Sequence, residues 1–237
     1  MRWIATVIAA LALHAGAAGA QILPPMEGYR VDVSFSGALQ ERMASINNLE
    51  QRYEERFREH RTIDRTGAQA GSQRFAEQRT AGAEWAGERL IAEVSGFTVE
   101  NLVKAMVAYN INRVAPEFGG RVVIHIDELR LSNPPLAFLE STRSAAAGTI
   151  RITDGDGYLR LDERVEADLI VQPTVNTGYQ GPDFAFIETE PARRVGPTLA
   201  QFVERALEKA WPERADELAG PIIVRISGPG DRLLSEP

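Results

Sequence analysis

The segment ITDGDGYLRLDE, residues 152–163, has the carboxylate spacing that a calcium-binding loop needs. If Ile152 is the first position, Asp154 and Asp156 fall at ligand positions three and five, Gly157 at the turn and Glu163 at the bidentate end. Ile152 cannot coordinate a cation, and strands are expected on both sides where a calcium loop of this kind has helices. Asp-Gly pairs also favour a tight hairpin turn. We expect a hairpin turn here, with a calcium site as the alternative and no other cofactor.

His125 and Asp127 lie two positions apart in an alternating apolar run, so both side chains should point to one face of a strand. A carboxylate beside an imidazole can orient it for acid–base chemistry or help it to bind a metal. A histidine on the polar face of a sheet explains the same spacing. The sequence has no Gly-x-Ser-x-Gly elbow, P-loop or Gly-x-Gly-x-x-Gly fingerprint. Because no complete catalytic set can be named, binding is favoured over catalysis.

Two further segments carry aromatic residues in polar surroundings. The long segment 172–192 holds Tyr179, Phe184 and Phe186 between Gly and Pro, and long loops of this kind are often binding loops. The alternative is a loop that folds its aromatics over the end of its own sheet. In QRYEERFREHR, charge surrounds Tyr53 and Phe57, which is typical of a solvated surface helix or, alternatively, of a partner-binding helix.

The elements that must position these residues follow from hydrophobic periodicity. Strands are expected at 29–36, 121–131 with a bulge near Asp127 and Glu128, 148–153, 158–171 and 222–226. Helices are expected from Leu39 past Phe57, over 73–93, over 98–114 with Thr98 as cap, and after Pro197 with Thr198 and Gln201 as a capping box. The order β-α-α-α-β-β-β-α-β predicts an α+β fold, a mostly antiparallel sheet packed against amphipathic helices.

The first twenty residues have the pattern of a secretory signal peptide. Arg2 precedes the apolar run WIATVIAALAL, and Ala18-Gly19-Ala20 has the small-x-small spacing of a cleavage site. We therefore expect a signal peptide at 1–20, an extended leader at 21–28 and a single domain at 29–237, from which the charged helical region 38–93 can protrude. The product would be a soluble periplasmic protein without a membrane span, because the apolar run is too short to cross a bilayer.

Composition narrows the classes of partner. The chain has no cysteine, which excludes disulfides and thiolate metal sites, and its formal net charge of −7 gives no reason to expect nucleic acid. The sequence leaves the oligomeric state open.

The segments VDVSFSG, RVVIHIDELRLSN, GTIRITDGDGYLRL and TLAQFVERALEKAW resemble, in their order, proteobacterial periplasmic envelope domains of unknown function with a fold like the TolB amino-terminal domain. The chain differs from the lipoproteins among them in lacking a lipidation cysteine. The resemblance implies a non-enzymatic role as an accessory that docks on an envelope protein partner. The alternative function is a periplasmic small-ligand binder or hydrolase, with segment 172–192 over a pocket that has His125 and Asp127 near its floor.

Overall fold

The computed structural model describes residues 23–62, 85–131, 144–169, 175–176, 179–187, 190 and 194–225. It confirms the predicted α+β class. Its elements, in chain order, are β1 (Arg30–Phe35), α1 (Gly37–Thr62), α3 (Ala86–Leu90), η1 (Val94–Gly96), α4 (Val99–Val114), β2 (Gly120–Arg130), β3 (Ala145–Asp154), β4 (Leu159–Asp168), β5 (Val175–Asn176), β6 (Phe184–Ile187), α5 (Gly196–Ala210), η2 (Pro212–Glu217) and β7 (Pro221–Arg225).

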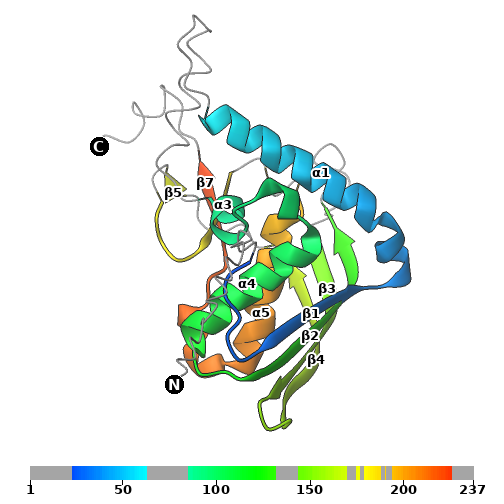
Figure 1. Cartoon of the computed structure of the whole chain (residues 1–237), viewed down its shortest axis with the longest axis vertical. Helices are drawn as coiled ribbons and strands as arrows, with labels where there is room; N and C mark the ends of the chain where they lie inside the picture. Colours follow the sequence, from blue (N-terminus) through cyan, green and yellow to red (C-terminus); the bar gives the residue numbers. More distant parts are fainter. Residues whose placement is uncertain are drawn as a thin grey trace, which may run out of the picture.

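The main sheet has four strands in the order β1-β2-β3-β4 (Figure 1). β1 runs parallel to β2, and the remaining two pairs are antiparallel. A second, smaller sheet has the order β5-β7-β6 with parallel pairing. The hairpin of β3 and β4 extends beyond the rest of the fold at the lower end of the view in Figure 1.

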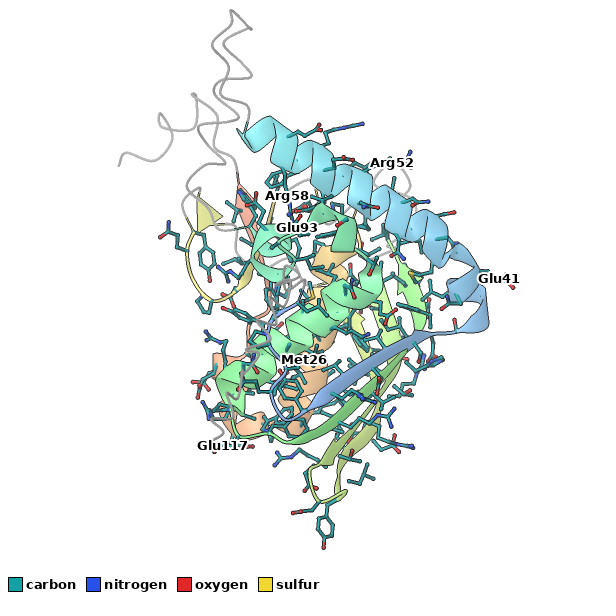
Figure 2. All side chains as sticks on the ribbon, viewed as in Figure 1. Met26, Glu41, Arg52, Arg58, Glu93 and Glu117 are labelled. Carbon is teal, nitrogen blue, oxygen red and sulfur yellow. The ribbon has the colours of Figure 1, made fainter. Side chains whose placement is uncertain are left out.

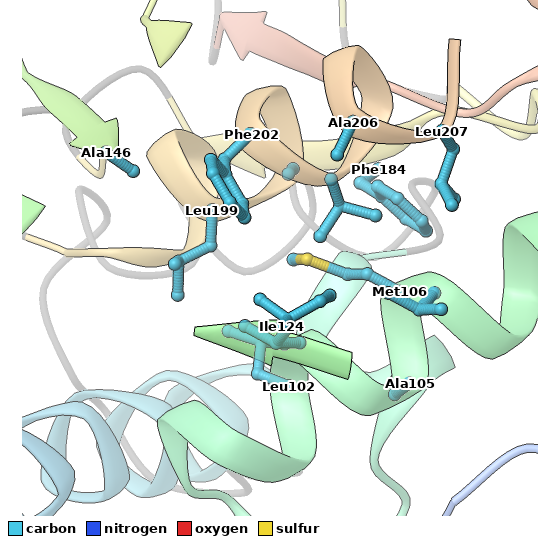
Figure 3. Packing of buried hydrophobic residues seen from close by; sticks show 14 of the residues in the cluster. Leu102, Ala105, Met106, Ile124, Ala146, Phe184, Leu199, Phe202, Ala206 and Leu207 are labelled. Carbon is cyan, nitrogen blue, oxygen red and sulfur yellow. The ribbon is translucent and has the colours of Figure 1, made fainter. Parts of the chain in front are cut away.

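α4 and α5 cover one face of the main sheet, and the core lies between these layers. Ile124 of β2 has no exposed surface and faces Leu102 and Met106 of α4 and Phe202 of α5 (Figure 3). Burial of each such side chain contributes about 1.5–3 kcal/mol relative to exposure. Successive side chains of β2 point alternately to this face and to the opposite one, which carries the polar residues 121, 125 and 127. We call it the outer face.

Most predicted elements of the main layer agree with the structure. The β-bulge lies between Ile126 and Glu128, where it was expected. Thr98 caps α4, because its hydroxyl accepts a hydrogen bond from the Asn101 N–H at 3.2 Å. The capping box at α5 is wrong. The helix begins at Gly196, so Thr198 already lies in the first turn, fully buried, and its hydroxyl makes no hydrogen bond.

Segment 172–192 also differs from the prediction. Phe184 to Ile187 form strand β6 beside β7, so the described part is not one structureless loop. Of the predicted helix 73–93, the described residues 85–93 contain only the short helix α3. The expected signal peptide at 1–20, residues 63–84 and residues 132–143 lie outside the described residues.

α1 packs against the fold along one side. Leu39 and Met43 are buried in the main core, and Arg58 lies on the side of α1 that faces α3, whereas Arg52 lies on the opposite side (Figure 2). No helix in the described ranges is both long and apolar enough to span a bilayer.

Candidate functional site

The outer face of the main sheet carries rows of polar side chains that the strand register places side by side. Ser34 of β1 pairs with His125 of β2, which pairs with Thr149 of β3, which in turn pairs with Arg164 of β4. Directly opposed residues on one face of a sheet have Cβ atoms about 4.5–5.5 Å apart, so their side chains interact. These four residues form one continuous cross-strand row.

Within this row, His125 connects a hydroxyl to a carboxylate. The Ser34 Oγ lies 2.9 Å from the His125 Nδ1, and the His125 Nε2 lies 3.3 Å from the Asp127 Oδ1. Asp127 also accepts a close hydrogen bond from the Arg164 guanidinium. Serine, imidazole and carboxylate therefore meet in the order that nucleophilic catalysis requires.

Among the described residues, no complete set of the other parts of such a catalyst surrounds this triad. β2 and β3 each pair on both sides, so the sheet uses most of their backbone N–H groups and leaves few to form an oxyanion hole near His125. Arg164 holds the Asp127 carboxylate, which then has less freedom to stabilise a charged imidazole. The Ser34 hydroxyl also lies 3.3 Å from the Ile124 carbonyl, which competes for its one proton. The arrangement is better suited to hydrogen bonding than to acyl transfer.

Beside the triad lies a groove of about 490 Å³ on the same face. Most of its lining residues have side chains that can donate hydrogen bonds, and one of them, Val123, is apolar. The lining residues are Arg121, Val123, His125, Thr149, Arg151, Thr153 and Asp162. Arg121 is paired with Asp32 at 2.7 Å and Arg151 with Asp162 at 2.6 Å. A guanidinium has five N–H donors, more than one carboxylate can accept, so the groove has an excess of donors. It suits a ligand surface rich in carbonyl or carboxylate oxygens.

The Asp-Gly turn at the end of this face is a hairpin turn in the structure. The Asp154 Oδ1 accepts the N–H groups of Asp156 at 3.1 Å and Tyr158 at 2.9 Å, and Gly157 has a φ of +84°. Glu163 lies further along β4, opposite Ile150, and pairs with Lys209 of α5. The hairpin thus separates Glu163 from the two aspartates. Within the described ranges, no three His, Cys, Asp or Glu side chains come together in a way that could hold a metal ion.

A second polar cluster, which the sequence did not reveal, is buried between α1 and α5. Arg194, with 9 % of its side chain exposed, bonds to Glu50 at 3.0 Å, Glu54 at 2.9 Å and Glu190 at 2.6 Å. Glu50 also accepts the N–H of Val195 at the start of α5. We call Glu50, Glu54, Glu190 and Arg194 the α1–α5 clamp.

The electrostatics of the clamp follow from its burial. Burial raises the pKa of Glu190 above its ordinary value, although Arg194 opposes this shift. For Arg194, burial acts to lower the pKa, but the carboxylates of Glu190, Glu50 and Glu54 outweigh it, so the pKa lies above its ordinary value. The guanidinium therefore stays charged, and the clamp joins two helices that are far apart in sequence.

The aromatic residues proposed as contacts are used largely inside the fold. Phe184 has no exposed surface and Phe186 only 5 %, because both belong to β6. Phe57 packs edge-on against Trp85 with ring centroids 5.5 Å apart, and the Tyr179 hydroxyl donates to Asp183 at 2.7 Å. Tyr53 is half-buried on α1. None of these five aromatic side chains is among the residues that line the groove at His125.

The fold and the groove define the class of protein as a two-layer α+β protein with an open, polar sheet face. No family model matches the chain, and comparison with curated proteins and with solved structures gives no match.

Proposed function

We propose that this chain is an exported envelope protein without catalytic activity that docks on a protein partner through the outer face of its main sheet. The observation that carries the proposal is the donor-rich groove of about 490 Å³, lined by residues of three adjacent strands. The signal-peptide pattern at 1–20 supports export to the periplasm, and the resemblance to envelope accessory domains supports docking.

The groove suits a partner better than the aromatic residues Tyr53, Phe57 and Tyr179. Phe57 and Tyr179 already take part in internal packing, and Tyr53 is half-buried, so engaging these side chains would require local rearrangement. The groove residues are held in place by strand pairing, and recognition by preorganised groups costs less conformational entropy. Val123 contributes the apolar contact at the centre of the surface, while Arg121 and Arg151 determine its preference for oxygen-rich partners.

In-cell photo-crosslinking tests this proposal. A photoreactive residue replaces Val123 in the groove, and a matched control replaces Glu41, which is exposed on α1. We expect one discrete adduct from position 123, weakened by Arg151→Glu in the same chain, and none from position 41. Adducts from position 41 alone, or none from position 123, would reject the outer face as the docking surface.

The Ser34–His125–Asp127 contacts support hydrolysis as a second candidate function. In that case the Ser34 oxygen would attack an electrophile while His125 accepts its proton. A fluorophosphonate probe measures this directly, because attack forms an O–P bond and releases fluoride. Labelling lost in both Ser34→Ala and His125→Ala would establish a nucleophilic serine, whereas we expect no labelling of Ser34 in the folded protein.

A further inference from the structure

The tip of the β3–β4 hairpin exposes two large side chains next to each other. Tyr158 is 74 % exposed and Leu159 59 % exposed, the highest values among the exposed large hydrophobic residues of the described chain. Leu159 pairs with Thr153, a groove residue, while the neighbouring Arg160 turns to the inner side and stacks over Trp211. The register shifts between Ile152 and Thr153, so Arg160 is the extra residue of a bulge, and Leu159, directly opposite Thr153, belongs to the outer face.

This tip is rigid and acidic. The carboxylate of Asp154 fixes the turn through two backbone N–H groups, and Asp156 is exposed beside it. The tip thus offers apolar surface together with negative charge. The groove on the same face offers the complement, since Val123 is flanked by Arg121 and Arg151, whose guanidinium groups have N–H donors beyond those that Asp32 and Asp162 accept.

We propose that a second copy of this chain occupies the outer face, with the hairpin tip of each copy seated in the groove of the other. A surface that carries a tip and its complement side by side is self-complementary, and two copies can close on it with two-fold symmetry. Asp156 of one copy then lies against the arginines of the other, and Leu159 and Tyr158 cover Val123. The inference rests on the proposed function, because it gives an occupant to the same groove.

The size of the face is adequate for such a contact. Three strands of ten or eleven residues and β1 of six residues, spaced about 4.8 Å apart, cover a plane of roughly 570 Å². Side-chain relief increases the accessible area beyond the plane, and a standard interface buries about 800 Å² on each partner. Charge complementarity and area therefore both favour a reversible dimer over a permanent one.

Sedimentation of the purified mature chain tests the inference. The wild type should form a dimer as concentration rises. Asp156→Arg and Arg151→Asp should each weaken self-association at least about tenfold, because like charges then meet. An equimolar mixture of the two variants should restore it, since each tip then meets a groove of opposite charge. Glu41→Arg, with the same change in net charge on α1, should leave it unchanged.

Arg151→Asp loses its pair with Asp162, so Leu159→Ser serves as a second, structurally mild variant that should also weaken the dimer. A monomer at every concentration, or a dimer insensitive to Asp156→Arg and Leu159→Ser, would overturn the inference. The crosslinking experiment from position 123 tests the proposed function independently of the dimer. A crosslink from position 123 to a different protein, with a monomer in solution, supports the docking function and rejects the dimer. If position 123 gives no crosslink and the chain stays a monomer, both the docking function and the dimer are rejected.

Discussion

Arg194→Met tests whether the α1–α5 clamp holds the fold together. The substitution keeps an apolar stem of similar length but removes the charge that pairs with Glu50, Glu54 and Glu190. Glu50 and Glu54 are each only 2 % exposed, so water cannot replace the lost hydrogen bonds. Removing one partner of a buried ion pair typically costs 3–5 kcal/mol, because a charge is left buried without compensation.

The value expected for this site lies within that range. Three carboxylates lose one guanidinium, and Arg58 still bonds to Glu54 at 2.9 Å, which limits the loss. We therefore expect the free energy of unfolding to fall by about 3–5 kcal/mol, a large part of the 5–15 kcal/mol typical of a domain. The loss should shrink at acid pH, since a protonated carboxyl no longer needs a cation.

Urea unfolding followed by circular dichroism measures this change by linear extrapolation. Arg52→Met on the solvent side of α1 is the matched control, expected to change stability by no more than about 0.5 kcal/mol. A double-mutant cycle with Glu50→Gln should show coupling, because the two side chains touch. If Arg194→Met costs less than about 1 kcal/mol, or no more than Arg52→Met, the clamp does not act as a buried ion cluster.

Three further changes test other parts of the fold. Burial, helped by Asp183 and Glu208, raises the pKa of Glu204 from its ordinary 4.5 to about 7, so the folded state takes up a proton and stability should fall as pH rises from about 4.5 through 7. The full shift corresponds to about 3 kcal/mol, which solvent reduces to about 1–2 kcal/mol at this half-buried side chain. Glu204→Gln should remove that slope in urea midpoints measured against pH, and an unchanged slope would contradict the assignment. Asn110→Ala should cost about 2–4 kcal/mol in urea unfolding, because the buried amide bonds both to the carbonyl of Ala219 at 3.1 Å and to its N–H at 2.6 Å. A fall in the free energy of unfolding of less than about 1 kcal/mol would mean that water replaces the hydrogen bonds of Asn110 to the Ala219 backbone. Gly148→Ala should lower the melting temperature, since a Cβ at this position would collide with the carbonyl oxygen of His125 in the neighbouring strand, and an unchanged value would show that the strands can separate there.

The sequence predicted the layers well because each has a clear period. Alternation in β2 and β3 and the three-to-four spacing in α4 and α5 come from burying one face, and the burial of Ile124, Ile150, Met106 and Phe202 agrees with it. The predictions that were wrong concern short segments of the chain. The stretch around Phe184 has no long alternating run, because β6 has only four residues and three of them are buried. A short buried strand of this kind is indistinguishable from a loop by period alone.

The clamp was missed for a different reason. Leu39, Met43 and Ile46 mark one face of α1, and the same spacing continues through Glu50, Glu54 and Phe57. The charged segment QRYEERFREHR, which includes Glu54, is predicted from its sequence to be solvated, since glutamate is rarely buried without a partner. The partner, Arg194, is 144 residues away from Glu50 and could not be paired with it from spacing. The three-to-four spacing that continues through Glu50 and Glu54 indicated that these residues lie on the buried face of α1. A charged residue on the buried face of a helix predicts an oppositely charged partner.

The outer face illustrates the limit that applies to function. His125 and Asp127 could be placed together because they share a strand, but Ser34 joins them only through the parallel register of β1 and β2, across 91 residues. Arg164 enters from the fourth strand in the same way. A shift of one residue in either register would send these side chains to the core, so the buried faces of β1 and β4 hold the polar row in place. The energy that positions the candidate site therefore comes from Val31, Val165 and their neighbours on the inner face, which is why substitutions in the groove can change binding while the fold is retained.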